Sequence, residues 1–285
     1  MAEIWQTKEL VAEIKARVKA DIENIMAAKG IAPGLAIVRV GENPDDISYE
    51  RSIIRSSDQL GVKARVYANP ADIPMADFTA LLARLNQDSE VHGILIFRPL
   101  PPQLDYDVIK HLLNPAKDID CITPENLAKL FQGERDVLFP TTSEAVVEIC
   151  KHFHGPLTGC EVAIVNRSMV VGRPLAMMLL NENATVTICH SKTRDLPAVT
   201  AAADIVVAAI GKANFFGAEY FNSESSVIDV GINLDSAGKL VGDVDYEPVS
   251  SLVKAITPVP GGVGPVNSAL LLRNVLTACQ RQLQA

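Results

Sequence analysis

The sequence has no long apolar run, few aromatic residues and no excess of positive charge. Its longest apolar run, 205–210, is far shorter than the roughly 20 residues of a membrane-spanning helix, so we expect no membrane partner. A net charge of -8 argues against a nucleic-acid surface, and we expect no nucleic-acid partner. The first residues lack the apolar segment of a secretory signal peptide. We therefore expect a cytoplasmic protein.

The cysteines show no metal-binding or disulfide spacing. There are five, with no C-x-x-C pair and no zinc pattern, at Cys121, Cys150, Cys160, Cys189 and Cys279. We expect no metal site and a reducing compartment, in which most of these residues are small members of the core.

The chain alternates helical and strand patterns, which favours parallel sheets covered by helices. Its 285 residues suggest about two domains at roughly 150 residues each. Apolar spacing predicts helices over 10–25, 47–61, 75–85, 125–131, 143–154 and 268–282. Short apolar runs predict strands over 35–40, 62–66, 91–97, 162–165, 185–188, 205–209, 227–230 and 255–257. The expected architecture is two α/β domains, 1–142 and 143–267, with a cleft between them.

One strand–turn–helix segment could hold a dinucleotide pyrophosphate. A strand at 162–165 enters a polar turn, and the following helix opens on Pro174, where a missing N–H is tolerated. Unpaired N–H groups and the helix dipole favour an anion there. Asn166 replaces the first glycine of the usual pattern and tolerates a left-handed backbone, while Gly172 remains. The candidate residues are Asn166, Arg167, Ser168, Val171, Gly172 and Pro174. An ordinary βα turn is the alternative.

The end of the next strand indicates which nucleotide this turn would hold. An NAD site usually offers Asp or Glu there, whereas this chain has Cys189 to Thr193 and no acid before Asp195. Hydroxyls and cations suit a 2′-phosphate, so His190, Ser191 and Arg167 favour NADP over NAD. A solvated polar loop is the alternative, and His190 is a candidate for a structural or cofactor role rather than a catalytic base.

A rigid segment near the end of the chain predicts a ligand wall. Residues 257–265 hold three glycines and three prolines, an unusual density unless the backbone must pass close to a ligand.

Several motifs together resemble the methylenetetrahydrofolate dehydrogenase/cyclohydrolase family of the FolD type. The matching stretches are 117–120 (KDID), 185–193 (TVTICHSKT), 227–233 (VIDVGIN), 241–244 (VGDV) and 256–265 (ITPVPGGVGP). The resemblance implies an N-terminal folate-binding domain joined by the C-terminal helix 268–285, a Rossmann-like NAD(P)-binding domain, and a homodimer. It implies oxidation of 5,10-methylenetetrahydrofolate to the methenyl form in one-carbon metabolism. Most members of the family also hydrolyse that product to 10-formyltetrahydrofolate.

The same resemblance supplies candidate site residues. It implies catalytic roles for Tyr49 and Asp120. It implies a substrate site formed by Tyr49, Phe97, Asp120, Pro260, Gly261 and Gly262. It adds Gly231, Ile232 and Thr257 to the cofactor-binding residues.

The departures from the family pattern concern the hydrolytic step. The family carries Tyr-x-x-x-Lys on the second helix, but the position four residues after Tyr49 is Ile53. The family glutamine is replaced by Phe97, and the leucine after it by Arg98. Further along, Cys121 stands in place of a glycine, and 141–143 replaces Cys-Thr-Pro.

No other side chain on the second helix supplies the missing base. Ile53 lies only about 40° around the helix from Tyr49, whereas Arg55 lies about 240° around it and points elsewhere. Arginine also stays charged and cannot accept the proton. Hydride transfer needs only the positioning of two rings, and Phe97 could add an aromatic surface or close the strand end.

Three functions follow as hypotheses. The first is an NADP-dependent dehydrogenase whose cyclohydrolase step is weak, lost or served by another group. The second is a bifunctional enzyme that produces 10-formyltetrahydrofolate. The third is a folate- or nucleotide-binding protein without catalysis.

Overall fold

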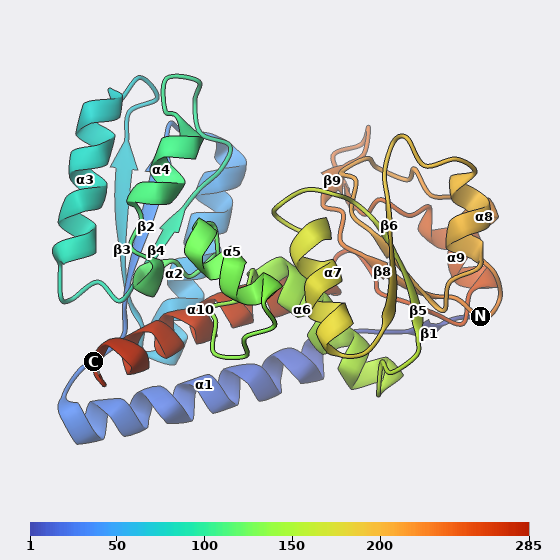
Figure 1. Cartoon of the computed structure of the whole chain (residues 1–285), viewed down its shortest axis with the longest axis horizontal. Helices are drawn as coiled ribbons and strands as arrows, with labels where there is room; N and C mark the ends of the chain where they lie inside the picture. The colour runs from blue at the N-terminus through green and yellow to red at the C-terminus, as the bar shows by residue number, and fades with distance from the viewer. Residues whose placement is uncertain (285) are drawn as a thin grey trace. The chain divides into compact units, whose positions relative to one another are not determined.

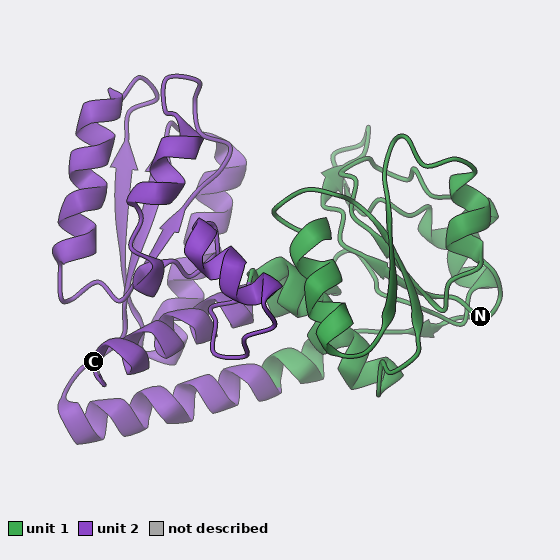
Figure 2. Ribbon diagram, viewed as in Figure 1, with its two compact units in different colours: residues 1–12, 140–267 green, residues 13–139, 268–285 purple. Residues whose placement is uncertain are grey.

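The computed structural model describes residues 1–284, which form two compact units (Figures 1 and 2). Unit 1 comprises Met1–Ala12 and Pro140–Asn267, and unit 2 comprises Glu13–Phe139 with the chain from Ser268 onward. The predicted class, two α/β domains with a parallel sheet, is confirmed. The sequence predicts that residues 1–12 belong with the N-terminal domain, which corresponds to unit 2. They lie in unit 1 because Ile4 pairs with Ile256 at the edge of its sheet.

Unit 2 is built on a three-stranded parallel sheet in the order β3-β2-β4. Its strands are β2 (Gly34–Val40), β3 (Lys63–Asn69) and β4 (Gly93–Ile96). Its helices are most of α1 (Lys8–Lys29), α2 (Pro44–Leu60), α3 (Met75–Gln87), α4 (Tyr106–Leu112), η1 (Pro115–Lys117), α5 (Pro124–Phe131) and most of α10 (Val263–Gln282). The central strand β2 is buried on both faces from Leu35 to Val38, as a parallel strand between helical layers requires. On one face, Phe78 and Leu82 of α3 and Ile109 of α4 form the core with the sheet.

Unit 1 contains a six-stranded parallel sheet in the order β1-β11-β8-β7-β5-β6. Its strands are β1 (Glu3–Ile4), β5 (Glu161–Val165), β6 (Thr185–Cys189), β7 (Ile205–Ala208), β8 (Ser226–Asp229) and β11 (Ala255–Ile256). The short pair β9 (Asn233–Leu234) and β10 (Leu240–Val241) is antiparallel. Its helices are α6 (Thr141–Ile149), the π-helical turn η2 (Cys150–His154), α7 (Gly172–Asn181), α8 (Leu196–Ala201), η3 (Ala218–Tyr220) and α9 (Tyr246–Leu252).

The strand order of unit 1 reverses at β5. From β5 the chain passes to β6 on one side and then to β7 on the other. In open α/β sheets the crevice at such a reversal, beyond the carboxyl ends of the strands, is where ligands bind. The segments that begin at Asn166 and Ala209 leave the sheet there.

The starts of α7 and α10 differ from the sequence prediction at a proline. Helix α10 begins at Val263 rather than at residue 268, and α7 begins at Gly172 rather than at Pro174. In both cases a proline lies inside the first turn, Pro265 in α10 and Pro174 in α7. A proline is tolerated there because the first N–H groups of a helix have no partner within the helix.

The sequence prediction also missed several short elements, namely β1, α4, α8, α9 and the β9–β10 pair. Within residues 1–284, the helices are all too short or too polar to cross a membrane.

Candidate functional site

The turn after β5 is organised by the side chain of Asn166. Its Oδ1 accepts hydrogen bonds from the backbone N–H groups of Ser168 (2.8 Å) and Gly172 (3.0 Å). Its Nδ2 donates to the carbonyl of Ala209, which follows β7. The turn does not use the left-handed backbone that asparagine tolerates, because Asn166 is not among the described non-glycine residues with positive φ. Asn166 is suited to this position by its amide, which ties the turn to both β7 and α7.

A glycine is required at the start of α7. A Cβ atom on Gly172 would lie 2.0 Å from the carbonyl oxygen of Asn166, so the turn can pass this close to the helix only without a side chain. The hydroxyl of Ser168 accepts the N–H of Val171 at 3.2 Å. Pro174 is buried in the first turn of α7.

A hollow of about 480 Å³ lies beyond β5 and β6. Its lining residues are Val165, Asn166, Arg167, Ser168, Cys189, His190, Ser191, Leu196, Ile210, Lys212 and Phe215. Five residues predicted for the cofactor therefore lie together here. No carboxylate lines the hollow, and two cations, Arg167 and Lys212, do. This charge pattern fits a ligand that carries phosphate groups.

His190 has a structural role in this hollow. Its Nδ1 accepts the backbone N–H of Lys192 at 3.1 Å, and the backbone N–H of His190 donates to the hydroxyl of Thr193 at 2.9 Å. These bonds close the 190–193 turn, in which Ser191 and Lys192 are exposed, and His190 and Ser191 line the hollow from it.

Lys212 is a member of the site that the sequence analysis missed. Its ammonium lies 5.6 Å from the ring centroid of Phe215, within cation–π range, and both residues line the hollow. In the sequence, Lys212 is recognisable only as a cation shortly after the buried strand β7. The strand order is needed to place β7 next to β5.

Two smaller hollows lie at the ends of β7, β8 and β11. One, of about 260 Å³, is lined by Thr142, Val171, Ala209, Gly211, Val230, Gly231, Ile232, Val263, Gly264 and Asn267. The other, of about 120 Å³, includes Pro260, Gly261 and Gly262 and also Gly231 and Ile232. Gly231 and Ile232, predicted for the cofactor, line both hollows. They therefore lie beside the segment 260–262, which is predicted for the substrate and lines the smaller hollow. Thr257 lines neither hollow and is fully buried.

Two buried carboxylates hold the loops around these hollows. Asp243 accepts the N–H groups of Ile210 (2.5 Å), Gly211 (3.0 Å) and Lys212 (2.8 Å). It also accepts the side-chain amide of Asn233 at 2.9 Å. Asp243 therefore fixes the segment from which Lys212 projects.

The second carboxylate, Asp229, fixes the neighbouring loop. It accepts the N–H groups of Gly231 (3.0 Å), Asp243 (2.9 Å) and Val244 (3.0 Å), and its own N–H donates to Thr257 Oγ1 at 2.8 Å. A Cβ on Gly242 would lie 1.8 Å from its Oδ2, so this close packing requires glycine. Burial raises the pKa of Asp229 to about 7, although its three N–H partners oppose the shift.

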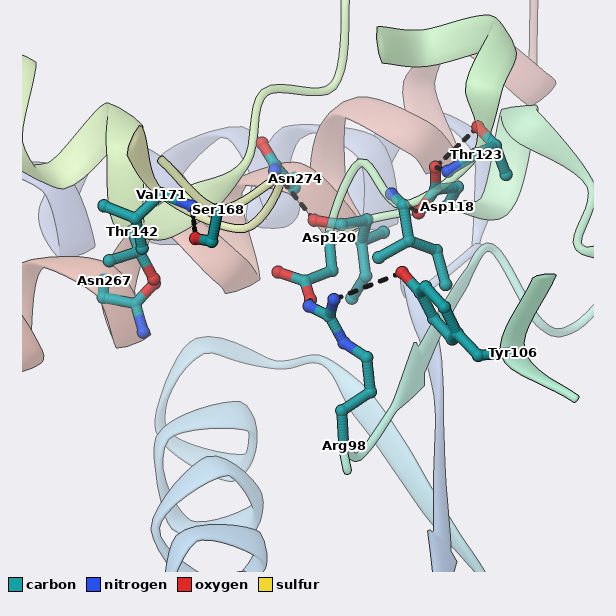
Figure 3. A network of polar contacts seen from close by, with 12 residues as sticks. Arg98, Tyr106, Asp118, Asp120, Thr123, Thr142, Ser168, Val171, Asn267 and Asn274 are labelled. Carbon is teal, nitrogen blue, oxygen red and sulfur yellow. Dashed lines mark hydrogen bonds and ion pairs between the residues drawn. The ribbon is translucent and has the colours of Figure 1, made fainter. Parts of the chain in front are cut away.

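In unit 2, Arg98 and Asp120 form an ion pair at the end of β4 (Figure 3). The Nη2 of Arg98 lies 2.6 Å from Asp120 Oδ2, and Nη1 lies 3.3 Å from the hydroxyl of Tyr106. Burial works against the charge on Arg98, but the Asp120 carboxylate and Tyr106 outweigh it and raise the pKa of the guanidinium. In the sequence alone, Arg98 is only a departure from the family pattern, and nothing there pairs it with Asp120.

The position of Asp120 is set by the buried Asp118. This carboxylate accepts the N–H of Ile122 (3.0 Å), the N–H and hydroxyl of Thr123 (2.9 and 2.7 Å) and the amide of Asn126 (3.0 Å). Cys121 lies in the turn with φ of 53°, a left-handed conformation that explains why glycine is the family residue there. The KDID motif therefore contains one residue for the site and others that build its turn.

The rings of Tyr49 and Phe97 stack, with centroids 5.5 Å apart and an interplanar angle of 29°. Phe97 is 7% exposed and Ile53 only 2% exposed, so the positions of the family glutamine and lysine hold buried apolar side chains. Phe97 closes the strand end and also supports Tyr49. Arg55 is exposed on the outer face of α2, as predicted.

A metal ion has no evident place in this site. Over residues 1–284, no group of three or more His, Cys, Asp or Glu side chains is arranged to hold one. The five cysteines are free thiols, and four of them are buried.

Comparison with known proteins finds two family models that together span most of the chain. The model for the tetrahydrofolate dehydrogenase/cyclohydrolase catalytic domain matches residues 5–120. The model for the NAD(P)-binding domain of the same group matches residues 140–283.

Relatives and solved structures of this group resemble the whole chain. "Bifunctional protein FolD 1" of Desulfitobacterium hafniense is 49% identical over 282 residues, which cover 99% of this chain and 100% of that protein. A crystal structure of the bifunctional FolD enzyme from Campylobacter jejuni matches with a TM-score of 0.95 and 38% identity, covering 99% of this chain and 100% of that one. The Trypanosoma brucei FolD enzyme, solved with NADP cofactor and inhibitor, matches with a TM-score of 0.94 and 32% identity, covering 100% and 99%.

Proposed function

Because the chain belongs to the tetrahydrofolate dehydrogenase/cyclohydrolase family, we propose that it oxidises 5,10-methylenetetrahydrofolate to the methenyl form with NADP as hydride acceptor. One observation carries the cofactor assignment. The hollow beyond β5 and β6 is lined by Arg167 and Lys212 and by no carboxylate. Phosphate groups are stabilised there, and the acid that usually bonds an NAD ribose is absent from the lining.

The residues of unit 1 would bind NADP at the strand ends. The turn held by Asn166 presents the N-terminus of α7 to the pyrophosphate, and Gly172 allows the close approach. Arg167, Ser191 and Lys212 take the 2′-phosphate. The hollow lined by Val171, Gly231 and Ile232 takes the nicotinamide ring. When bound, the cofactor supplies the carbon that accepts the hydride.

The residues of unit 2 would bind the folate. Tyr49, supported by Phe97, offers an aromatic surface, and Asp120 accepts hydrogen bonds from the amino and N3–H groups of the pterin. The family resemblance also assigns Pro260, Gly261 and Gly262 to the substrate; within unit 1, Thr7 fixes this segment through hydrogen bonds from its hydroxyl to the carbonyls of Gly261 and Gly262. The protein's contribution to hydride transfer is the placement of the two rings.

Hydrolysis of the methenyl product requires more than placement. Water must lose a proton as it attacks, and a buried lysine can be tuned to serve as the base. At the corresponding position this chain has Ile53, and its neighbour Phe97 is equally apolar. We propose that the chain releases mainly the methenyl product.

A bifunctional enzyme is the second candidate, since the relative that is 49% identical is named bifunctional. In that case another group would activate water, and rapid enzyme-dependent decay of methenyltetrahydrofolate would reveal it. Tight folate binding without hydride transfer would instead support the third hypothesis, a binding protein.

We also propose a homodimer in the cytoplasm. Strand β6 forms an edge of the six-stranded sheet, and Ile188 on it and Leu180 on α7 are exposed large apolar side chains. Such a strand is a natural site for self-association. The free thiols suit a reducing compartment.

The experiment is an initial-rate assay of NADPH formation from NADP and 5,10-methylenetetrahydrofolate. The proposal requires saturable turnover, with NAD a poorer acceptor. Absence of reduction of either nucleotide would refute the proposed function.

A further inference from the structure

Arg98 brings a fixed positive charge against the carboxylate proposed to bind the pterin. The two side chains are about equally exposed, at 22% for Arg98 and 24% for Asp120, so solvent reaches the pair from one side. Tyr106 holds the guanidinium from another side, with its hydroxyl 3.3 Å from Nη1 and its ring centroid 5.8 Å from Cζ. Arg98 is thus oriented by two partners before any ligand arrives.

The pair presents a donor beside an acceptor. An ionised carboxylate only accepts hydrogen bonds, and a guanidinium only donates, through five N–H groups. The two bonds described for Arg98 use two of these, one each on Nη1 and Nη2. Since an arginine fork is planar and rigid, its remaining N–H groups point in set directions.

A 2-amino-4-oxopteridine has the complementary edge. Its 2-amino group and N3–H donate, and its 4-oxo oxygen accepts. A 2,4-diaminopteridine has an amino group in place of this oxygen and, as a consequence, no hydrogen on N3. Its ring also takes up a proton more readily. A guanidinium that faces position 4 of a 2,4-diaminopteridine therefore meets an amino group, which is also a donor, on a ring that readily becomes positively charged. Both effects weaken binding of the diamino ring.

We propose that Arg98, paired with Asp120, selects 4-oxo pterins over 2,4-diamino pterins by donating to the 4-oxo oxygen. This inference rests on the proposed function, because it takes Asp120 as the group that holds the pterin. It assigns Arg98 as a specificity-determining residue of this chain, at a position where the family carries leucine.

The test compares two probes that differ only in the 4-substituent and the N3 hydrogen that goes with it, namely 10-methylfolic acid (4-oxo) and methotrexate (4-amino), and the Arg98 variants isolate the contribution of Arg98. Inhibition constants of both are measured for wild type, Arg98→Leu and Arg98→Lys, with Arg55→Leu as an exposed control on α2. Wild type should favour the 4-oxo probe by about tenfold or more, the effect expected of one hydrogen bond from a charged donor. Arg98→Leu should abolish or reverse this preference, and Arg98→Lys should retain part of it.

The KM for NADP reports the integrity of each variant, because its proposed site lies in unit 1. An unchanged probe ratio in Arg98→Leu would overturn the inference while leaving the dehydrogenase function intact. If Arg98→Leu does not fold, an unchanged ratio in Arg98→Lys, whose ammonium lacks the fork, would overturn it equally. Failure of wild type to reduce NADP would instead refute the proposed function.

Discussion

Tyr49 and Phe97 stack ring against ring, and Ile53, one helical turn after Tyr49, is buried on the same face of α2. The part of the site where the family places a lysine and a glutamine is therefore apolar. Hydride transfer tolerates this change because it needs no proton acceptor. Hydrolysis of the methenyl group does not tolerate it, because the attacking water must lose a proton.

Restoring the two family residues should restore hydrolysis. Ile53→Lys with Phe97→Gln is expected to accelerate decay of methenyltetrahydrofolate at least about tenfold over wild type, since a positioned base contributes 10²–10⁴-fold in enzymes. Ile53→Met with Phe97→Gln is the matched control, because it has a chain of similar length without an amine. Equal rates for the two double variants would show that the missing lysine is not the cause.

The cations of the β5–β6 hollow should set the preference for NADP over NAD. Arg167→Ala and Lys212→Ala are each expected to raise the KM for NADP about tenfold or more, while the KM for NAD changes little, because only NADP carries the 2′-phosphate. Lys192→Ala serves as the control, since Lys192 is an exposed cation of the adjacent turn that does not line the hollow. A proportional loss for both nucleotides would contradict the assignment.

The raised pKa of Asp229 predicts a stability that falls as the pH rises. With its pKa raised to about 7, Asp229 holds its proton in the native state up to that pH, while the unfolded chain releases it at the ordinary aspartate pKa of about 4. Stability from this group is therefore complete below about pH 4 and is lost progressively up to about pH 7, by roughly 4 kcal/mol in total.

Asp229→Asn isolates this dependence. Asparagine cannot ionise, so the free energy of unfolding of wild type minus that of the variant should decrease from about pH 4.5 to pH 7 and level off above it. Urea unfolding across this range gives the difference. A difference that stays constant with pH would mean that Asp229 titrates at the same pH in the folded and unfolded states.

The local parts of the fold and the site were predictable from sequence. The 166–172 turn and the 189–193 strand end lie beside each other because consecutive parallel strands release their chains at the same edge of the sheet. The helix starts at Gly172 and Val263 are not predictable in this way, because Pro174 and Pro265 suggest boundaries although the first turn of a helix accepts proline.

The non-local contacts were not predictable. Lys212 joins the β5–β6 hollow only because β7 pairs with β5 on the side opposite β6, which is a property of the strand order. Arg98 reaches Asp120 across 22 residues, and Asp229 accepts the N–H of Asp243 across 14. Each of these contacts needs the packed structure to bring two loops together, and no local pattern marks them in advance.

The most direct test of the whole account is a single progress curve. Wild-type protein is given NADP and 5,10-methylenetetrahydrofolate, and NADPH, methenyltetrahydrofolate and 10-formyltetrahydrofolate are quantified together over time. The account predicts that NADPH and the methenyl form rise in equal amounts, while the 10-formyl form appears no faster than it does from the methenyl compound without protein. Formation of 10-formyltetrahydrofolate at the rate of NADPH formation would contradict it.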